Sequence, residues 1–144
     1  MILLHRLYEF GLPTEEMINI YTLYIRSILE SSAVVWHSAI TQAEETDIER
    51  VQKVALRVIL KSDYESYENA LLLTGLDTLE QRRTILCEKF AKNCTKNKKI
   101  KHMFPLNPSS VETRNPEKYY VQHATTSRLA DSAIPYMQRL LNLQ

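Results

Sequence analysis

The sequence predicts an all-α fold, a bundle of about four to six helices with an irregular proline-containing loop and a short C-terminal helix. Three observations favour this class. Only two of the 144 residues are glycine, which leaves few positions for the tight turns of a hairpin-rich β fold. Apolar residues recur at spacings of three and four over long stretches. Residues typical of helix ends stand at the borders of those stretches.

The N-terminal part is predicted to hold the end of one helix, which stops at Gly11, and then a long second helix. Thr14 is a suitable N-cap for this second helix, which we expect to reach about His37 and to bend at Ser31-Ser32. One apolar face is predicted to run through Met17, Ile18, Tyr21, Ile25, Ile28, Leu29, Val35 and Trp36.

Three more helices are predicted in the middle of the chain. The first covers about residues 43–61, with a core stripe made of Ile48, Val51, Ala55, Val58 and Ile59. The second covers residues 66–74 and is closed by Gly75. The third covers residues 78–93 and begins with a capping box of Thr78 and Gln81.

Helix signals become sparse after residue 103. Residues 105–116 contain three prolines and are predicted to form a loop, and residues 118–125 could form a short extended segment. A last helix is expected over residues 132–141. We therefore expect a helical domain of residues 1–103, and a loop and C-terminal tail of residues 104–144 that packs on it.

Charge is distributed unevenly along the chain. Residues 1–80 hold six basic and thirteen acidic side chains, whereas residues 81–103 hold eight basic and one acidic. Such a basic run is typical of a phosphate-binding surface or of a solvated linker, and Lys96, Lys98, Lys99 and Lys101 could also be a nuclear-import patch. No apolar run is long enough to cross a bilayer and no signal peptide is convincing, so we expect no membrane partner and an intracellular location, in the nucleus or cytoplasm.

No spacing of catalytic or metal-ligating residues stands out. Cys87 and Cys94 are seven apart on a predicted helix, too far for a disulfide, and are interpreted as small buried hydrophobes rather than as a metal pair with His102. The carboxylates of residues 1–80 are spread over several helices, whereas nucleotide addition needs clustered carboxylates that hold two metal ions. We expect no metal, no cofactor and no enzyme activity in this chain.

Two basic stripes are the candidate binding residues. Spacings of three and four align each set along one side of a helix, where it could follow a nucleic-acid backbone or form a solvated face. The first stripe consists of Arg50, Lys53, Arg57 and Lys61, and the second of Arg82, Lys89, Lys92 and Lys96.

Arg83 and Trp36 are assigned structural roles. Arg83 falls on the apolar face of its helix beside Leu86 and Phe90, so we expect it to tie helices together while Arg82 faces phosphate. Trp36 shares its face with Ile25, which favours core packing over base stacking.

Four sequence blocks in a fixed order point to a family. The blocks are Tyr-Ile-Arg-Ser-Ile-Leu-Glu (24–30) with Val35-Trp36, Ile-Glu-Arg-Val-Gln-Lys (48–53), Leu-Glu-Gln-Arg-Arg (79–83) and Ser-Ala-Ile-Pro-Tyr (132–136). Together they resemble the C-terminal region of the LINE- or jockey-like reverse transcriptases of non-LTR retrotransposons. The aromatic residue and alanine before paired aspartates, which mark the polymerase site of that family, do not occur in this sequence.

The resemblance implies a non-catalytic fragment, the thumb and tail of an RNA-directed DNA polymerase. Such a thumb grips the RNA or DNA template–primer duplex through its backbone, independently of sequence. The resemblance also implies a missing palm domain, or a protein partner, against an apolar N-terminal surface formed by Ile2, Leu3, Leu4, Leu7 and Phe10. The alternatives are a helical protein-interaction module and a decayed copy of the element that binds no nucleic acid.

Overall fold

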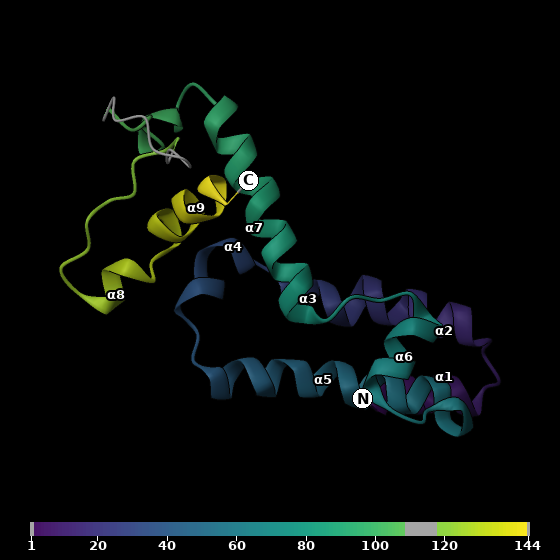
Figure 1. Cartoon of the computed structure of the whole chain (residues 1–144). Helices are drawn as coiled ribbons and strands as arrows, with labels where there is room; N and C mark the ends of the chain where they lie inside the picture. The colour runs from purple at the N-terminus through teal and green to yellow at the C-terminus, as the bar shows by residue number, and fades with distance from the viewer. Residues whose placement is uncertain (1, 109–117, 144) are drawn as a thin grey trace. The chain divides into compact units, whose positions relative to one another are not determined.

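The computed structural model describes residues 2–108 and 118–143 of the chain. All regular structure in these two ranges is helical, apart from an isolated antiparallel bridge between Leu106 and Tyr119 (Figure 1). The predicted all-α class is therefore confirmed. Residues 105–108 lie outside any helix, as expected, whereas residues 109–116 of the predicted loop lie outside the described residues.

The helical elements follow one another closely along the chain. In order they are α1 (Ile2–Glu9), α2 (Thr14–Ile20), the π-helical η1 (Tyr21–Arg26), α3 (Ser27–Glu30), α4 (Ala33–Trp36), the 3₁₀ turn η2 (His37–Ala39), α5 (Gln42–Leu60), the 3₁₀ turn η3 (Lys61–Asp63), α6 (Tyr67–Thr74), α7 (Leu79–Lys96), the 3₁₀ turn η4 (Lys101–Met103), α8 (Ser127–Ala130) and α9 (Ala133–Asn142).

The described residues divide into two compact units. The first contains the chain up to Ser31 together with Thr41–Arg82, and the second contains Ser32–Ile40 together with the described residues from Arg83 onward. The division therefore falls inside α7 and not at the expected boundary between residues 103 and 104. The reason is that the C-terminal tail packs against the second part of α7, so both belong to one unit.

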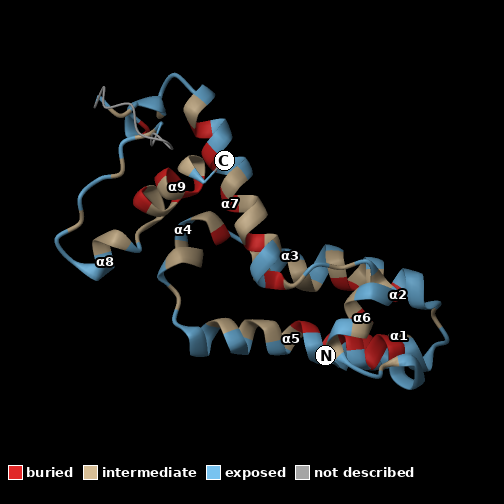
Figure 2. Ribbon diagram, in the orientation of Figure 1, coloured by how far each residue is buried: buried red, intermediate tan, exposed pale blue. Residues whose placement is uncertain are grey.

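The first unit is built around α5, which contacts α1, α2 and α6. Figure 2 shows that the buried residues of α5 lie in its C-terminal half. They include Ala55, Val58 and Ile59 of the predicted stripe, which join Met17, Tyr21 and Leu4 in one core cluster. Leu4 is fully buried, so its expected place in an exposed N-terminal patch is wrong. Burying such a side chain contributes about 1.5–3 kcal/mol.

Most of the predicted helix ends are confirmed. Thr78 and Gln81 exchange two hydrogen bonds of 3.3 and 3.2 Å at the start of α7, which is the predicted capping box. Gly75 closes α6 in the left-handed region, with φ +65°. Thr14, however, is the first residue of α2, where Pro13 holds the N-cap position. A second capping box, Thr41 with Glu44, begins α5 and was not predicted.

The long second helix is interrupted where the sequence suggests only a bend. Ser32 has φ 55°, which breaks the helix at the predicted place. A π-helical segment, η1, precedes this break. Its wider turn, with hydrogen bonds five residues apart, rotates the following side chains relative to an α-helix. Ile28, which follows η1, is 74% exposed, and Val35, which follows the break at Ser32, is 66% exposed, although periodicity placed both on the buried face.

The second unit is held together by α9, whose predicted bounds are confirmed to within a residue. Met137 packs with Ala91, Cys94 and Phe104 in the core of this unit. The amide of Gln138 is buried between two segments, because it donates to the Met103 carbonyl at 2.8 Å and accepts from the Gln122 N–H at 2.9 Å. These bonds tie the irregular segments on either side of residues 109–117 to α9.

Candidate nucleic-acid interface

The first basic stripe lies in the first unit, with Arg50, Lys53 and Arg57 on α5, and each of its four side chains has a local partner. Lys61 does not continue the helical stripe as predicted, because α5 ends at Leu60 and Lys61, with φ 44°, begins η3. Arg50 is about three-quarters exposed and lies 3.7 Å from the Asp47 carboxylate. The other three cations lie over tyrosine rings, in the pairs Lys53–Tyr67 at 4.9 Å, Arg57–Tyr64 at 5.2 Å and Lys61–Tyr8 at 3.3 Å from the ring centroid. A phosphate contact by these groups would compete with cation–π interactions of about 0.5–1 kcal/mol each.

Arg82 belongs to the second predicted stripe but forms an ion pair within the first unit. Its Nε lies 3.1 Å from Oε1 of Glu30, which also accepts from Arg26 Nε at 3.2 Å. The Glu30 side chain is only 14% exposed and thus shares its charge between two guanidinium groups. Phosphate binding by Arg82 would weaken this cluster, so Arg82 is a poorer phosphate ligand than its sequence position indicates.

Arg83 lies in the second unit and is fully buried, more deeply than the expected half-burial. Its Nε donates to Nδ1 of His37 at 3.3 Å, and its guanidinium lies 5.7 Å from the centre of the half-buried Trp36 ring. His37 in turn meets Tyr136 of α9 edge to face, with centroids 5.6 Å apart. This geometry supports the structural role that the sequence assigns to Arg83 and Trp36.

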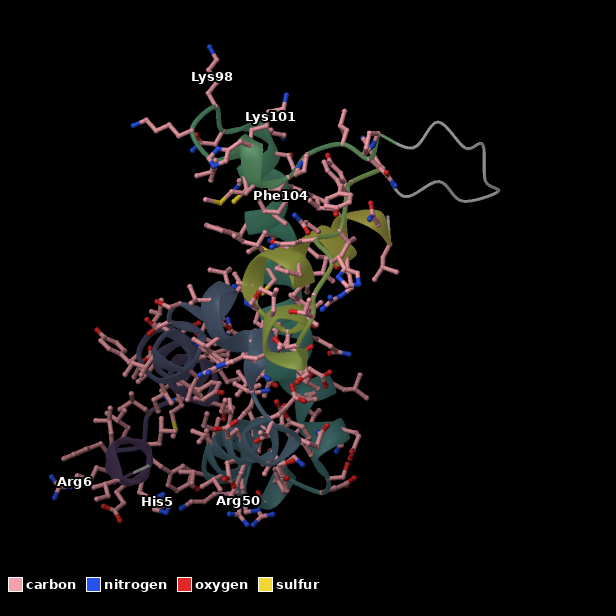
Figure 3. All side chains as sticks on the ribbon, turned by 90° about the vertical axis from the view of Figure 1, so that its left-hand side faces the viewer. His5, Arg6, Arg50, Lys98, Lys101 and Phe104 are labelled. Atoms are coloured by element: carbon pink, nitrogen blue, oxygen red, sulfur yellow. The ribbon has the colours of Figure 1, made fainter. Side chains whose placement is uncertain are left out.

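The remaining lysines of the second stripe are exposed on α7. Lys89, Lys92 and Lys96 are spaced by three and four residues, and no ion pair joins them to a carboxylate within residues 2–108 and 118–143. Further exposed lysines follow the end of the helix. Figure 3 shows Lys98 and Lys101 projecting outward from the chain beyond α7. This part of the second unit therefore presents a surface of unneutralised positive charge.

Partly buried polar bonds fix the start of α7 in the first unit. The Leu79 N–H donates to both carboxylate oxygens of Glu49, at 3.2 and 3.1 Å, and Tyr67 Oη donates to the same carboxylate. A carboxylate suits the positive end of a helix. Gln52 extends the network, since it accepts from Tyr21 Oη at 2.7 Å. Burial raises the pKa of Tyr21 and of Tyr67 above their usual value, and the bond to Glu49 adds to the shift of Tyr67.

Two residues near the lysines of α7 were not among the predicted binding residues. Lys118 and Tyr119 border a surface pocket together with Lys92 and Lys96. No spacing in the sequence links positions so far apart, because only the packing of α9 brings them together.

The described residues contain no cluster of three or more His, Cys, Asp or Glu side chains arranged to hold a metal ion. Cys87 and Cys94 are both buried free thiols, as predicted. Burial raises the pKa of Cys87 to about 11, against a smaller opposing effect of the Arg83 charge. None of the helices in the described part of the chain combines the length and apolarity that a membrane span requires.

Comparison with known proteins gave no relative: no protein-family model, no curated protein and no solved structure matches this chain.

Proposed function

We propose that this chain is a non-catalytic helical element that binds the phosphate backbone of nucleic acid without sequence choice. The observation that carries the proposal is the set of exposed lysines along the second part of α7, Lys89, Lys92 and Lys96, which have no carboxylate partner in the described ranges. The resemblance to the thumb and tail of a non-LTR retrotransposon reverse transcriptase supports the same function, with a template–primer duplex as the ligand.

The chemistry of the lysines favours backbone binding over base recognition. An ammonium is a compact point charge that neutralises a phosphate without the planar fork that arginine uses to read guanine. Each phosphate neutralised on a B-form duplex steepens the dependence of log affinity on log salt by about 0.9. Loss of the three α7 lysines should therefore reduce this slope by about 2–3 if each contacts a phosphate.

Fluorescence anisotropy with a labelled RNA–DNA duplex at several salt concentrations tests the proposal. We expect Lys89→Gln with Lys92→Gln to weaken binding and flatten the salt dependence for duplexes of unrelated sequence. The matched control is Arg6→Gln with Arg128→Gln, which removes two exposed charges outside both stripes. Equal losses of duplex affinity in the two double variants would show that only the net charge of the protein matters. Binding that does not respond to salt would contradict the proposal.

The α5 stripe requires its own variant because it lies in the other unit. Replacing Arg50, Lys53, Arg57 and Lys61 with glutamine tests whether their tyrosine and aspartate partners leave them able to bind phosphate. A loss smaller than that caused by the α7 pair is expected, since each of these cations already has a partner.

The proposal includes the absence of polymerase chemistry. We expect no primer extension on an RNA template with magnesium and deoxynucleotides, because the paired aspartates that bind the metal ions are not in the sequence. Extension by protein free of contaminating polymerase would contradict this part of the proposal.

A second candidate function, protein interaction, is favoured by exposed apolar surface in the first unit. Leu71, Leu72 and Leu76 line a surface pocket of about 510 Å³ whose rim includes Glu68 and Asp77, and Leu72 is 82% exposed. Apolar association should survive high salt, whereas backbone binding should not. Pull-down of the same partner at low and high salt separates the two functions.

A further inference from the structure

A basic pocket of about 400 Å³ opens on the surface of the second unit. Its lining comes from three stretches of chain, namely Lys92, Thr95 and Lys96 of α7, Lys118 with Tyr119, and Leu141 of α9. Three lysines thus line one hollow, and no acidic residue is among the lining residues. The volume lies within the range of about 300–1,000 Å³ that is typical of small-molecule sites.

The aromatic wall of this pocket is held in place by its backbone. The Tyr119 N–H donates to Oδ1 of Asn142 at 2.9 Å, and the Tyr119 carbonyl accepts from Nδ2 of Asn142 at 2.9 Å. The bridge to Leu106 holds the same residue from the other side. Tyr119 is half-buried and packs against the core of the unit, and Lys118 Nζ lies 5.7 Å from its ring centroid. A ligand would therefore meet a preorganised ring beside three exposed lysines.

The polar groups of the pocket define the chemistry of its ligand. The lysines supply only donors and positive charge, which suits a phosphate. The Thr95 hydroxyl donates to the Lys92 carbonyl at 2.9 Å, so toward the pocket it offers an acceptor oxygen. Tyr119 and Leu141 offer apolar surface on which a planar base can stack. Phosphate, sugar hydroxyl and base are the three parts of a nucleotide.

We infer that this pocket binds a terminal nucleotide that carries a phosphomonoester, with the phosphate on the lysines and the base against Tyr119. A phosphomonoester carries up to two charges at neutral pH, so it matches three ammonium groups better than the single charge of an internal phosphodiester. A base inside a duplex is stacked and cannot reach the ring, whereas the end of a single strand can. This inference deepens the proposed function, because it adds recognition of strand ends to backbone binding.

The test uses the full chain and oligothymidylates that carry a phosphate on the 5′ end, on the 3′ end or on neither. We expect one of the phosphorylated ends to bind about fivefold more tightly than the unphosphorylated strand, because the terminal phosphate adds about 1 kcal/mol of interaction with the exposed lysines and holds the base beside the ring. Lys118→Gln and Tyr119→Leu should each reduce this ratio toward one. Tyr119→Leu keeps an apolar side chain and the backbone bonds to Asn142, and circular dichroism verifies that the variant is folded.

Lys89→Gln is the matched control, because Lys89 lies on α7 outside the pocket. It should weaken all three strands alike and leave the ratio unchanged. A ratio of one in the wild type, or a ratio that Lys118→Gln and Tyr119→Leu do not change, would overturn the inference. Duplex binding without a preference for phosphorylated ends would agree with the proposed backbone binding and contradict only the nucleotide-binding role of the pocket.

Competition separates a strand end from a free nucleotide, which has the same chemistry. Thymidine monophosphate should displace the phosphorylated strand at lower concentration than inorganic phosphate does. Equal competition by inorganic phosphate would show that Tyr119 contributes nothing and would overturn the nucleotide assignment. Binding of the monophosphate together with failure to bind any duplex would reject the proposed backbone function but retain the pocket.

Discussion

At the scale of residues, two adjacent arginines show how strongly environment decides function. Arg82 and Arg83 have the same chemistry, yet Arg82 pairs with a carboxylate at the edge of the first unit and Arg83 is buried in the second. The helical period separates them by about 100° around α7. Their difference follows from which face each occupies and from the partners that other elements bring to it.

The pair between Glu30 and Arg82 should contribute measurably to stability. A double-mutant cycle with Glu30→Gln and Arg82→Gln should give a coupling of about 1–2 kcal/mol, because the carboxylate is largely shielded from water. The matched cycle with Asp47→Asn and Arg50→Gln, an exposed pair, should give about 0–0.5 kcal/mol. Urea unfolding of the four variants of each cycle measures both values, and equal coupling energies would contradict the expected effect of burial.

Cys87 should make the protein less stable at alkaline pH. Burial raises the pKa of its thiol from 9.0 to about 11, so the folded state holds this proton more tightly than the unfolded state. The stabilisation is complete below pH 9 and is lost as the pH rises toward 11, by at most about 2–3 kcal/mol. Urea midpoints of the wild type and of Cys87→Ala across this interval provide the measurement. If the urea midpoint of Cys87→Ala falls by the same amount, the loss of stability is caused by other groups, such as Tyr67.

At the scale of elements, some helices begin with a side-chain cap and others do not. The sequence favours Thr14 as a cap because of its residue type, yet the Thr14 side chain makes no capping bond and the preceding Pro13 takes the position. Thr41 is a cap by geometry, since its hydroxyl accepts from the Glu44 N–H and the Glu44 carboxylate accepts from the Thr41 N–H at 2.8 Å. The hydrogen bonds that the Glu44 carboxylate accepts from the Thr41 N–H and from the Thr41 hydroxyl lower the pKa of Glu44.

Replacement of these threonines should therefore have unequal effects. Thr41→Ala and Thr78→Ala should each lower the free energy of unfolding by about 1 kcal/mol, because each removes the acceptor of a capping box. Thr14→Ala should cost less, since alanine is a good residue for a first helical turn. Thermal or urea unfolding of the three variants gives the comparison. A loss at Thr14 as large as that at Thr41 would show that Thr14 is a cap after all.

At the scale of the whole molecule, the exposed apolar residues near the N-terminus form a candidate contact surface. Ile2, Leu3 and Phe10 of the first unit are 75%, 51% and 82% exposed. A few hundred Å² of such surface corresponds to several kcal/mol of burial at about 25 cal/mol per Å². We therefore expect this end of the chain to self-associate or to bind a protein.

Substitution along α1 separates association from folding. Leu3→Ser with Phe10→Ser should reduce self-association and leave the helical content unchanged, because both side chains are exposed. Leu4→Ser should lower the free energy of unfolding by about 3 kcal/mol or more, since the Leu4 side chain of α1 is fully buried in the core of the unit. Sedimentation velocity over a range of concentrations measures association. A wild type that stays monomeric at high concentration would contradict the expectation.

The sequence by itself determined the helical class, the approximate bounds of α5, α6, α7 and α9, and the caps at Thr78 and Gly75. These features depend on local periodicity and on the conformational preferences of single residues. It also placed Arg83 on an apolar face, because that assignment needs only the helical period.

The tertiary structure alone decided which of the basic residues remain available. Helical periodicity predicts the same phosphate-binding role for Arg82 and Lys96. In the structure, however, Glu30 pairs with Arg82 from 52 positions away in the sequence. Lys118 reaches the pocket beside Lys96 through the packing of α9. The division of α7 between two units is likewise set by long-range packing. Helical spacing in the sequence shows which side of a helix a residue occupies. The partners on that side come from distant parts of the chain, and such contacts leave no local pattern in the sequence.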